Sequence, residues 1–201
     1  VKALFFIFLA SLFLTAAAHP SRSITNRVFD SIARVSIVRG EQQGYCSAFS
    51  INEINRYWMT AAHCYGEELK VAGQMATVIY RNDELDVMIL AVPGAKARAM
   101  RPSNIPITPG MEAASAGYAY GYLTPIIKSG RVASAHLAID ELRGSFVVLD
   151  FPIIGGMSGG PVVDRYGMVV GIVQQSAPDG STGYGVGVLL IRAFLLGTTP
   201  V

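Results

Sequence analysis

The chain has 201 residues, 51% of them hydrophobic, and its 16 Lys and Arg nearly balance its 14 Asp and Glu. This balance argues against a nucleic-acid partner or a polybasic membrane-surface role, since both depend on a strong excess of positive charge. The length allows one globular unit or two small lobes packed together. We expect the protein to be a monomer.

The first 18 residues have the features of an export signal. Lys2 is followed by an apolar run that ends in Ala16, Ala17 and Ala18. The run is shorter than the roughly 20 residues that cross a bilayer, and small residues suit a signal peptidase site. The sequence therefore predicts a signal peptide over residues 1–18 and a secreted or periplasmic protein with no membrane attachment after cleavage. An uncleaved membrane anchor is the alternative.

The chain has two cysteines, Cys46 and Cys64, and both fall in the exported part. Thiols outside the cytoplasm tend to be oxidised, so a single disulfide is predicted. Two cysteines alone are too few for a structural zinc site, and the three histidines are far apart in sequence. We expect neither a metal nor a cofactor.

Short apolar or alternating runs, separated by Gly, Asn and Asp, follow a polar entry and predict β-strands. The expected strands of the first half are Ala33–Val38, Tyr45–Ile51, Tyr57–Thr60, Ala76–Tyr80 and Val87–Val92. Those of the second half are Met111–Tyr118, Ile126–Leu137, Phe146–Phe151, Pro161–Val163, Met168–Val173 and Gly183–Val188.

The stretch between these two sets contains three prolines and no strand pattern, which predicts a linker. The expected organisation is a signal peptide (1–18), an N-terminal unit (19–95), a linker (96–110) and a C-terminal unit (111–201). A short helix over Leu189–Leu196 is expected to end the C-terminal unit, because the apolar spacing there is compatible with a helix.

Three segments have residues that suit nucleophilic catalysis. They are Thr60-Ala61-Ala62-His63-Cys64, Asp86-Val87-Met88-Ile89-Leu90 and Gly155-Gly156-Met157-Ser158-Gly159-Gly160-Pro161. Alone, each has a structural explanation: an incidental histidine, a turn aspartate, a flexible glycine loop. Together they supply a hydroxyl nucleophile, an imidazole base, an orienting carboxylate and unobstructed backbone N–H groups for an oxyanion.

The order of these residues separates two kinds of serine hydrolase. The stretch Gly156–Gly160 also matches the G-x-S-x-G turn of α/β-hydrolases, in which the histidine follows the serine. Here His19, His63 and His136 all precede Ser158. The chain order therefore excludes an esterase or lipase of that fold, and His63, Asp86, Ser158 is the order of the chymotrypsin arrangement.

These segments resemble those of the trypsin-like (chymotrypsin-fold) serine protease family. Thr60–Cys64 looks like the family's histidine motif, Ser158–Pro161 matches its serine motif, and Asp86–Leu90 is similar to its aspartate segment. Val170–Val173 resembles the strand that lines the substrate channel. The resemblance implies an all-β fold of two six-stranded antiparallel barrels with the active site in the cleft between them. It also implies a disulfide between Cys46 and Cys64 beside the histidine.

The resemblance implies a secreted serine endopeptidase acting on protein or peptide substrates, in which Ser158 attacks the peptide carbonyl. His63 would be the general base and then the general acid, and Asp86 would orient it. The N–H groups of Gly156 and Ser158 would form the oxyanion hole. Asp83 is the alternative to Asp86, which we prefer because it directly precedes the apolar run. The alternative function is a catalytically silent, protease-like binding or decoy protein.

Substrate binding is assigned to Pro152 at the pocket floor and to the strand residues Gln174, Gln175 and Ser176. With Ile153 and Ile154 nearby, the expected pocket is modest and apolar. Asp150 would favour Arg or Lys substrates instead if it entered the pocket.

The residue before the serine is Met157, where many trypsin-like zymogens have an aspartate that pairs with a newly cut N-terminus. A methionine cannot accept an ammonium charge. We therefore expect no ion-pair activation switch, and an oxyanion loop held by apolar packing of Met157.

Overall fold

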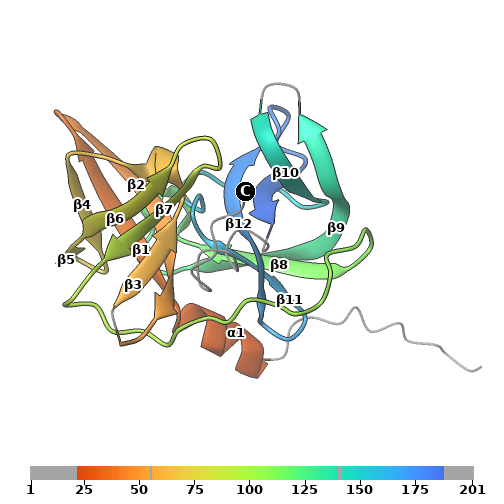
Figure 1. The fold of residues 1–201 in the computed structure, drawn as a ribbon, viewed down its shortest axis with the longest axis horizontal. Helices are drawn as coiled ribbons and strands as arrows, with labels where there is room; N and C mark the ends of the chain where they lie inside the picture. The colour runs from red at the N-terminus through yellow and green to blue at the C-terminus, as the bar shows by residue number, and fades with distance from the viewer. Residues whose placement is uncertain (1–21, 55, 140–141, 188–201) are drawn as a thin grey trace, which may run out of the picture.

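The fold is all-β, as predicted, and is described here from a computed structural model that covers residues 22–54, 56–139 and 142–187. Two β-sheet halves lie side by side, with the short helix α1 (Arg22–Phe29) below them (Figure 1). The predicted signal peptide and the predicted helix over Leu189–Leu196 lie outside these residues. Within them, no helix is long and apolar enough to span a bilayer.

The first half is a seven-stranded antiparallel sheet in the order β5-β4-β1-β2-β3-β7-β6. Its strands are β1 (Ile32–Arg39), β2 (Gln42–Asn52), β3 (Tyr57–Thr60), β4 (Glu68–Val71), β5 (Gln74–Met75), β6 (Thr77–Asn82) and β7 (Val87–Ala91). The second half is a closed barrel in the order β10-β13-β12-β11-β8-β9. Its strands are β8 (Glu112–Gly117), β9 (Ile126–Ile139), β10 (Leu142–Leu149), β11 (Pro161–Asp164), β12 (Val169–Ser176) and β13 (Gly183–Gly187).

The expectation of two six-stranded barrels holds for the second half only. In the first half a tight turn at Ala72 (φ 50°) and Gly73 (φ 77°) starts the two-residue strand β5, which pairs with β4. After Ala76 the chain continues as β6 and pairs with β7 at the other edge of the sheet. The two edges are thus joined by the chain itself and not by a ladder of hydrogen bonds.

Besides two 3-10 turns, Ala62–Cys64 and Ala119–Gly121, one helix and two strands are missing from the sequence prediction: α1, β4 and β5. In α1, Val28 is buried and packs with the half-buried Ile24 four residues earlier, so only one narrow face is apolar. In β4, Leu69 and Val71 are buried and alternate with exposed or half-exposed neighbours. These elements are too short for their periodicity to stand out.

One cluster of buried side chains crosses the boundary between the halves. It joins Val28 of α1 and Phe49 of β2 to Ile172 and Val186 of the barrel. Full burial of such a side chain contributes about 1.5–3 kcal/mol. The halves therefore share a core, and residues at their boundary are held in fixed positions.

The segment between the halves, residues 92–111, is fully described and contains no strand or helix. It is bonded to both sides: the N–H of Met100 donates to the carbonyl of Ser50 (2.8 Å), and the N–H of Val169 donates to the carbonyl of Arg101 (2.8 Å). A connection without regular structure is thereby fixed to the first sheet and to the barrel.

The predicted disulfide is present between Cys46 in β2 and Cys64 in the 3-10 turn Ala62–Cys64. The two residues are 18 apart in sequence, and both are buried. The bond ties the strand that meets the barrel to the turn that contains His63.

Replacing both cysteines, as Cys46→Ala with Cys64→Ala, is expected to lower the free energy of unfolding by about 3 kcal/mol, because the closed loop restricts the unfolded chain. Urea unfolding without added oxidant or reductant measures this change in the free energy of unfolding. An unchanged midpoint would show that the bond contributes nothing to stability.

Candidate active site

His63 is presented at the end of β3 by a compact turn. Ala61 and Ala62 are buried, and the 3-10 turn that follows leaves the His63 side chain 48% exposed. The Thr60 hydroxyl donates to the carbonyl of Ser47 (2.8 Å) and fixes the start of the turn. Beyond it, the Arg39 guanidinium donates to the carbonyls of His63 and Tyr65. The histidine is therefore anchored through its main chain, and its ring stays accessible.

Asp86 uses both carboxylate oxygens to hold His63. Its Oδ2 lies 2.7 Å from Nδ1 of the imidazole, and its Oδ1 accepts the main-chain N–H of His63, also at 2.7 Å. Asp86 has φ 49°, a left-handed conformation that aspartate tolerates better than most residues. Strain of this kind is found where a side chain must be aimed accurately.

The alternative carboxylate, Asp83, points elsewhere. Its Oδ1 accepts hydrogen bonds from Nε and from a terminal nitrogen of Arg81, both at 2.7 Å, and the side chain is 69% exposed. The structure thus brings Asp86 to the histidine and leaves Asp83 on the surface.

Ser158 lies in the loop between β10 and β11, on the barrel side of the boundary. Its Oγ donates to the carbonyl of Gln174 (3.0 Å), and in the described part of the chain no hydrogen bond joins it to His63. Its carbonyl accepts the N–H of Ser47 (2.8 Å) and lies 3.9 Å from Sγ of Cys64, the neighbour of His63. Ser158 is therefore fixed beside the His63 turn, with its hydroxyl turned toward Gln174.

Two glycines beside Ser158 adopt conformations that other residues would strain. Gly156 has φ 94°, and a Cβ there would lie 2.5 Å from the carbonyl oxygen of Tyr118. Gly159 has φ 81°, and a Cβ there would lie 2.2 Å from Oγ1 of Thr60. The N–H groups of Gly156 and Ser158 donate to no acceptor within the described residues. Two backbone donors are therefore available on this loop.

Ser47 connects these parts and was not recognised from the sequence. Its hydroxyl donates to the carbonyl of Gly156 (2.8 Å) and accepts the N–H of Tyr118 (2.8 Å). Its main-chain N–H donates to the carbonyl of Ser158, and its carbonyl accepts the hydrogen bond of the Thr60 hydroxyl. The residue is fully buried. The available signal was a small polar residue inside the apolar strand β2, next to Cys46.

Gln174 occupies a bulge in β12, between Val173 and Gln175 in the pairing with β13. A bulge re-aims the extra residue, and here its carbonyl meets the Ser158 hydroxyl while its side-chain Nε2 donates to the carbonyl of Leu85 (2.8 Å). Leu85 directly precedes Asp86. Gln174, which is buried, thus ties the serine of one half to the aspartate segment of the other.

The predicted pocket residues lie on two adjacent segments. Ser176 accepts the N–H of Ile153 (3.2 Å) and donates to its carbonyl (2.5 Å), which binds the end of β12 to the loop before the serine. Ile153 is buried, whereas Pro152 and Gln175 are exposed. The Asp150 carboxylate accepts the main-chain N–H of Arg131 on β9 (2.6 Å) and is held against the barrel by this bond.

Met157 is fully buried in the barrel core, where it packs in a cluster with Ala119, Phe151 and Ile153. The N–H of Tyr120 donates to the carbonyl of Gly155 (2.6 Å), so the segment that follows β8 also supports the glycine loop. Burial raises the pKa of the nearby Tyr118 hydroxyl, and the positive charge of Arg34 offsets part of this rise. The surroundings of the loop are apolar and carry no buried ion pair among the described residues.

The sulfur atoms of Cys46 and Cys64 lie within 4.8 Å of a potential ligand atom of His63. Because the sulfurs are bonded to each other, they are not the thiolates that bind zinc.

Ser47→Ala is expected to lower the free energy of unfolding by about 1–3 kcal/mol and to reduce activity, because the Tyr118 N–H and the Gly156 carbonyl lose their buried partner. Chemical unfolding and initial rates measure both effects. Ser115→Ala is the matched control, since the buried Ser115 hydroxyl has no hydrogen-bond partner in the described structure. Equal losses in the two variants would contradict the role assigned to Ser47.

Comparison with known proteins identifies a family and a fold. Residues 46–172, more than half of the chain, match the trypsin-like peptidase domain family. A sequence comparison with curated proteins finds no match.

Several solved protease structures have the same fold. The Rv3671c protease from M. tuberculosis in its active form has a TM-score of 0.77 at 22% identity, and the match covers 92% of this chain and 91% of that one. A variant of the HtrA-type protease AlgW with tripeptide has a TM-score of 0.76 at 19% identity, covering 87% of this chain and 62% of that one. The serine endoprotease from Yersinia pestis has a TM-score of 0.73 at 16% identity, covering 87% and 64%.

This chain thus spans less than two thirds of the HtrA-type chain and of the Yersinia pestis chain. The family match includes the segments that contain His63, Asp86 and Ser158. The chain belongs to the family of trypsin-like peptidase domains.

Proposed function

We propose that this protein is a secreted or periplasmic serine endopeptidase that hydrolyses peptide bonds through an acyl-enzyme on Ser158. The observation that carries the proposal is the 2.7 Å contact between His63 Nδ1 and Asp86 Oδ2, held beside Ser158 by bonds across the two halves. Membership of a peptidase family supports the reaction class. The disulfide supports a location outside the cytoplasm.

The first step is proton transfer from Ser158 to His63. When Asp86 accepts the Nδ1–H of the imidazole, Nε2 is left free as the base. The Ser158 hydroxyl must turn from the Gln174 carbonyl toward Nε2. Catalytic hydrogen bonds are often absent without substrate and form on binding.

The Ser158 oxygen then bonds to the peptide carbonyl carbon, and the carbonyl oxygen takes the negative charge. The free N–H groups of Gly156 and Ser158 are the donors for this oxyanion, and each such donor is worth about 3–4 kcal/mol in comparable enzymes. His63 returns its proton to the leaving amine as the C–N bond breaks. Water then repeats the sequence and releases the acid product.

For specificity we propose an apolar side chain on the acyl side of the cleaved bond. Ile153 and Ile154 are apolar residues of the loop before the serine. Ser176, at the end of β12, holds this loop through hydrogen bonds to the main chain of Ile153. Asp150 is held by the Arg131 N–H, which argues against a carboxylate that selects Arg or Lys.

Asp86→Asn should reduce kcat by a factor on the order of 10⁴, because an amide no longer holds the imidazole in the productive tautomer. Asp83→Asn is the matched control, and the surface position of Asp83 predicts near wild-type rates. Rates on a denatured protein substrate measure both variants. A fast Asp86→Asn enzyme would overturn the assignment of the carboxylate.

A fluorophosphonate probe is expected to label Ser158 in the wild type and not in Ser158→Ala. Removal of the signal peptide alone should suffice for labelling. Activation through an ion pair needs a carboxylate directly before the serine, and that position holds Met157, which is buried among apolar side chains. Mass spectrometry of the purified N-terminus, with active-site titration, tests this. Labelling that needs a further N-terminal cut would refute the account of activation, and a folded chain that never labels would favour the binding or decoy function.

A further inference from the structure

A pocket of about 250 Å³ lies where three separate parts of the chain meet, and three arginines line it. Arg27 comes from α1, and Arg98 and Arg101 come from the linker. The β11–β12 turn, from Tyr166 to Met168, closes the opposite wall. No acidic residue lines the pocket within the described chain.

These arginines have no partner inside the described structure. All three are exposed, and none of their guanidinium groups donates a hydrogen bond or joins an ion pair among residues 22–54, 56–139 and 142–187. Five other arginines do have a bonded acceptor: Arg34, Arg39, Arg81, Arg131 and Arg165. Like charges that share one pocket repel each other, and a bound anion would remove this cost.

Two acidic side chains near the pocket already accept hydrogen bonds. Glu53 accepts the N–H of Ala99 (2.8 Å), and Asp164 is buried and accepts bonds from the Ser103 hydroxyl and from the N–H groups of Tyr166 and Met168. Neither residue lines the pocket. Their bonds instead hold the linker and the β11–β12 turn in position as walls.

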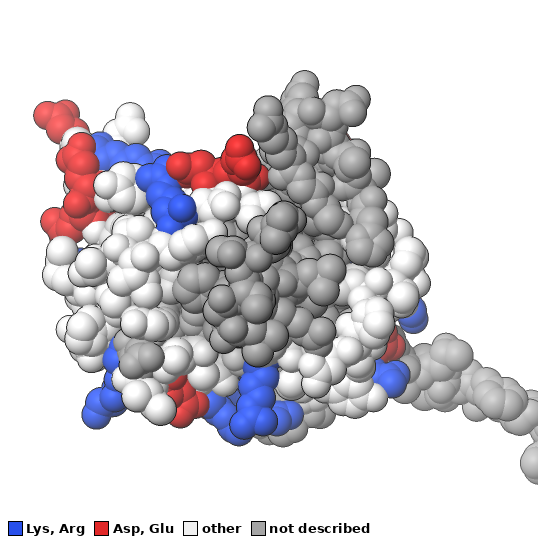
Figure 2. All heavy atoms as spheres, in the orientation of Figure 1, with Lys and Arg blue, Asp and Glu red and all other residues white. Residues whose placement is uncertain are grey.

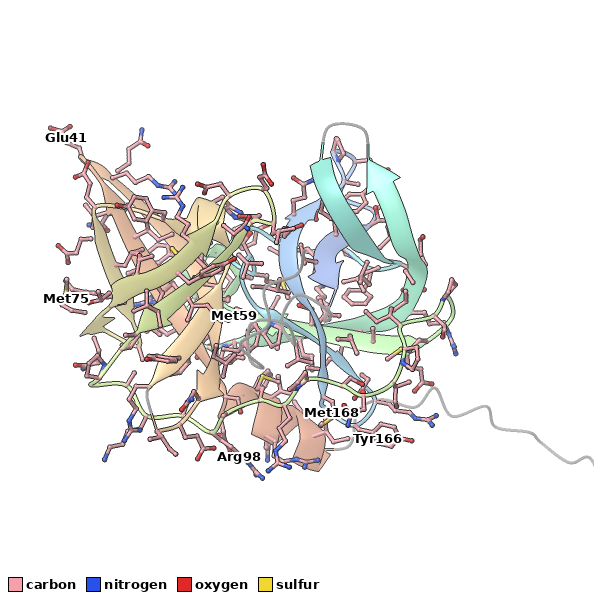
Figure 3. All side chains as sticks on the ribbon, viewed as in Figure 1. Glu41, Met59, Met75, Arg98, Tyr166 and Met168 are labelled. Carbon is pink, nitrogen blue, oxygen red and sulfur yellow. A yellow bond between two sulfur atoms is a disulfide. The ribbon has the colours of Figure 1, made fainter. Side chains whose placement is uncertain are left out.

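The arginines belong to a basic edge of the molecule. In Figure 2, Lys and Arg side chains outnumber acidic ones along the lower edge, while Asp and Glu lie mainly over the upper part of the first sheet, where basic side chains are also present. In Figure 3, Arg98, Met168 and Tyr166 lie along the same lower edge beside α1. A negatively charged ligand that approaches this edge would meet a favourable potential.

The pocket walls are firmly attached to both halves. Val28 and Met100, next to Arg27 and Arg101 in sequence, belong to the buried cluster that joins the first sheet to the barrel. The linker also forms main-chain hydrogen bonds to both halves, from the N–H of Met100 to Ser50 and from the N–H of Val169 to Arg101. A ligand held by Arg27 and by the linker would therefore brace the boundary between the halves.

We propose that this pocket binds a phosphate group with two or more negative charges. The planar guanidinium fork matches phosphate oxygens in a bidentate manner, and three such groups suit a tetrahedral polyanion better than a carboxylate with one charge. The phosphate can belong to a soluble ligand or to a lipid headgroup. Ser158 plays no part in this binding.

The first test uses the purified protein without the predicted signal peptide (residues 19–201) and inorganic pyrophosphate, compared with sodium chloride at equal ionic strength. Millimolar pyrophosphate is expected to raise Tm by about 2–4 °C, since a ligand that binds only the folded state stabilises it. Each of Arg27→Gln, Arg98→Gln and Arg101→Gln should reduce this rise, and the triple variant should abolish it. Arg165→Gln is the matched control: Arg165 adjoins Tyr166 but does not line the pocket, so the rise should persist.

A second arm measures cosedimentation of the same proteins with phosphatidic acid vesicles, whose phosphomonoester headgroup can carry two negative charges, and with phosphatidylcholine vesicles. Wild type and variants differ only at the arginines, so any difference between them reports on these side chains. Loss of phosphatidic acid binding in the triple variant alone assigns a lipid headgroup, and a pyrophosphate response without such a loss assigns a soluble phosphate. If the triple variant matches the wild type in both arms, or the wild type responds in neither, the proposal is wrong.

Discussion

The candidate active site depends on one buried contact, the insertion of Ser47 between the two halves of the protein. Its hydroxyl and main chain bond Gly156, Ser158, Tyr118 and Thr60, so a strand of the first sheet holds both the glycine loop of the barrel and the turn before His63. Because these polar groups are shielded from water, each bond lost leaves a partner unsatisfied at a cost of about 1–3 kcal/mol. Groups from separate halves are thereby held at fixed separations, as a reaction between them requires.

A second set of contacts extends the same principle to the aspartate. The bulge in β12 frees Gln174 to bond both Ser158 and the carbonyl of Leu85, and Asp86 then holds His63 through two oxygens. The glycine loop rests on the buried Met157 instead of a buried ion pair, which avoids the cost of desolvating two charges. The arginine pocket lies at another part of the same boundary, so a ligand there would stabilise the arrangement on which the site depends.

Much of the fold could be predicted because the longer strands have clear alternation or continuous apolar runs bounded by turn residues, as Tyr57–Thr60 and Val87–Ala91 do. The elements that escaped prediction, α1, β4 and β5, are short and bury at most two side chains each, so their pattern is weak. Whether a sheet closes is equally hidden, because closure depends on pairing between distant edges. Here the two-residue strand β5 and the turn at Ala72 leave the first sheet unclosed.

The types of chemical group and their order could be predicted from the residues alone: His63 before Asp86 before Ser158, two cysteines able to bridge, and glycines flanking the serine. Local chemistry carries that information, since motif residues are recognisable without their partners. The residues alone favoured Asp86 over Asp83, and the fold adds the 2.7 Å contact of Asp86 with His63 and the bond of Asp83 to Arg81. That Asp150 accepts the Arg131 N–H, and that Ser47 and Gln174 join the halves, depends on the packing. It alone brought Arg27 together with Arg98 and Arg101. These pairings link residues far apart in the chain, and their distances are set by how the sheet, the barrel and the linker pack together.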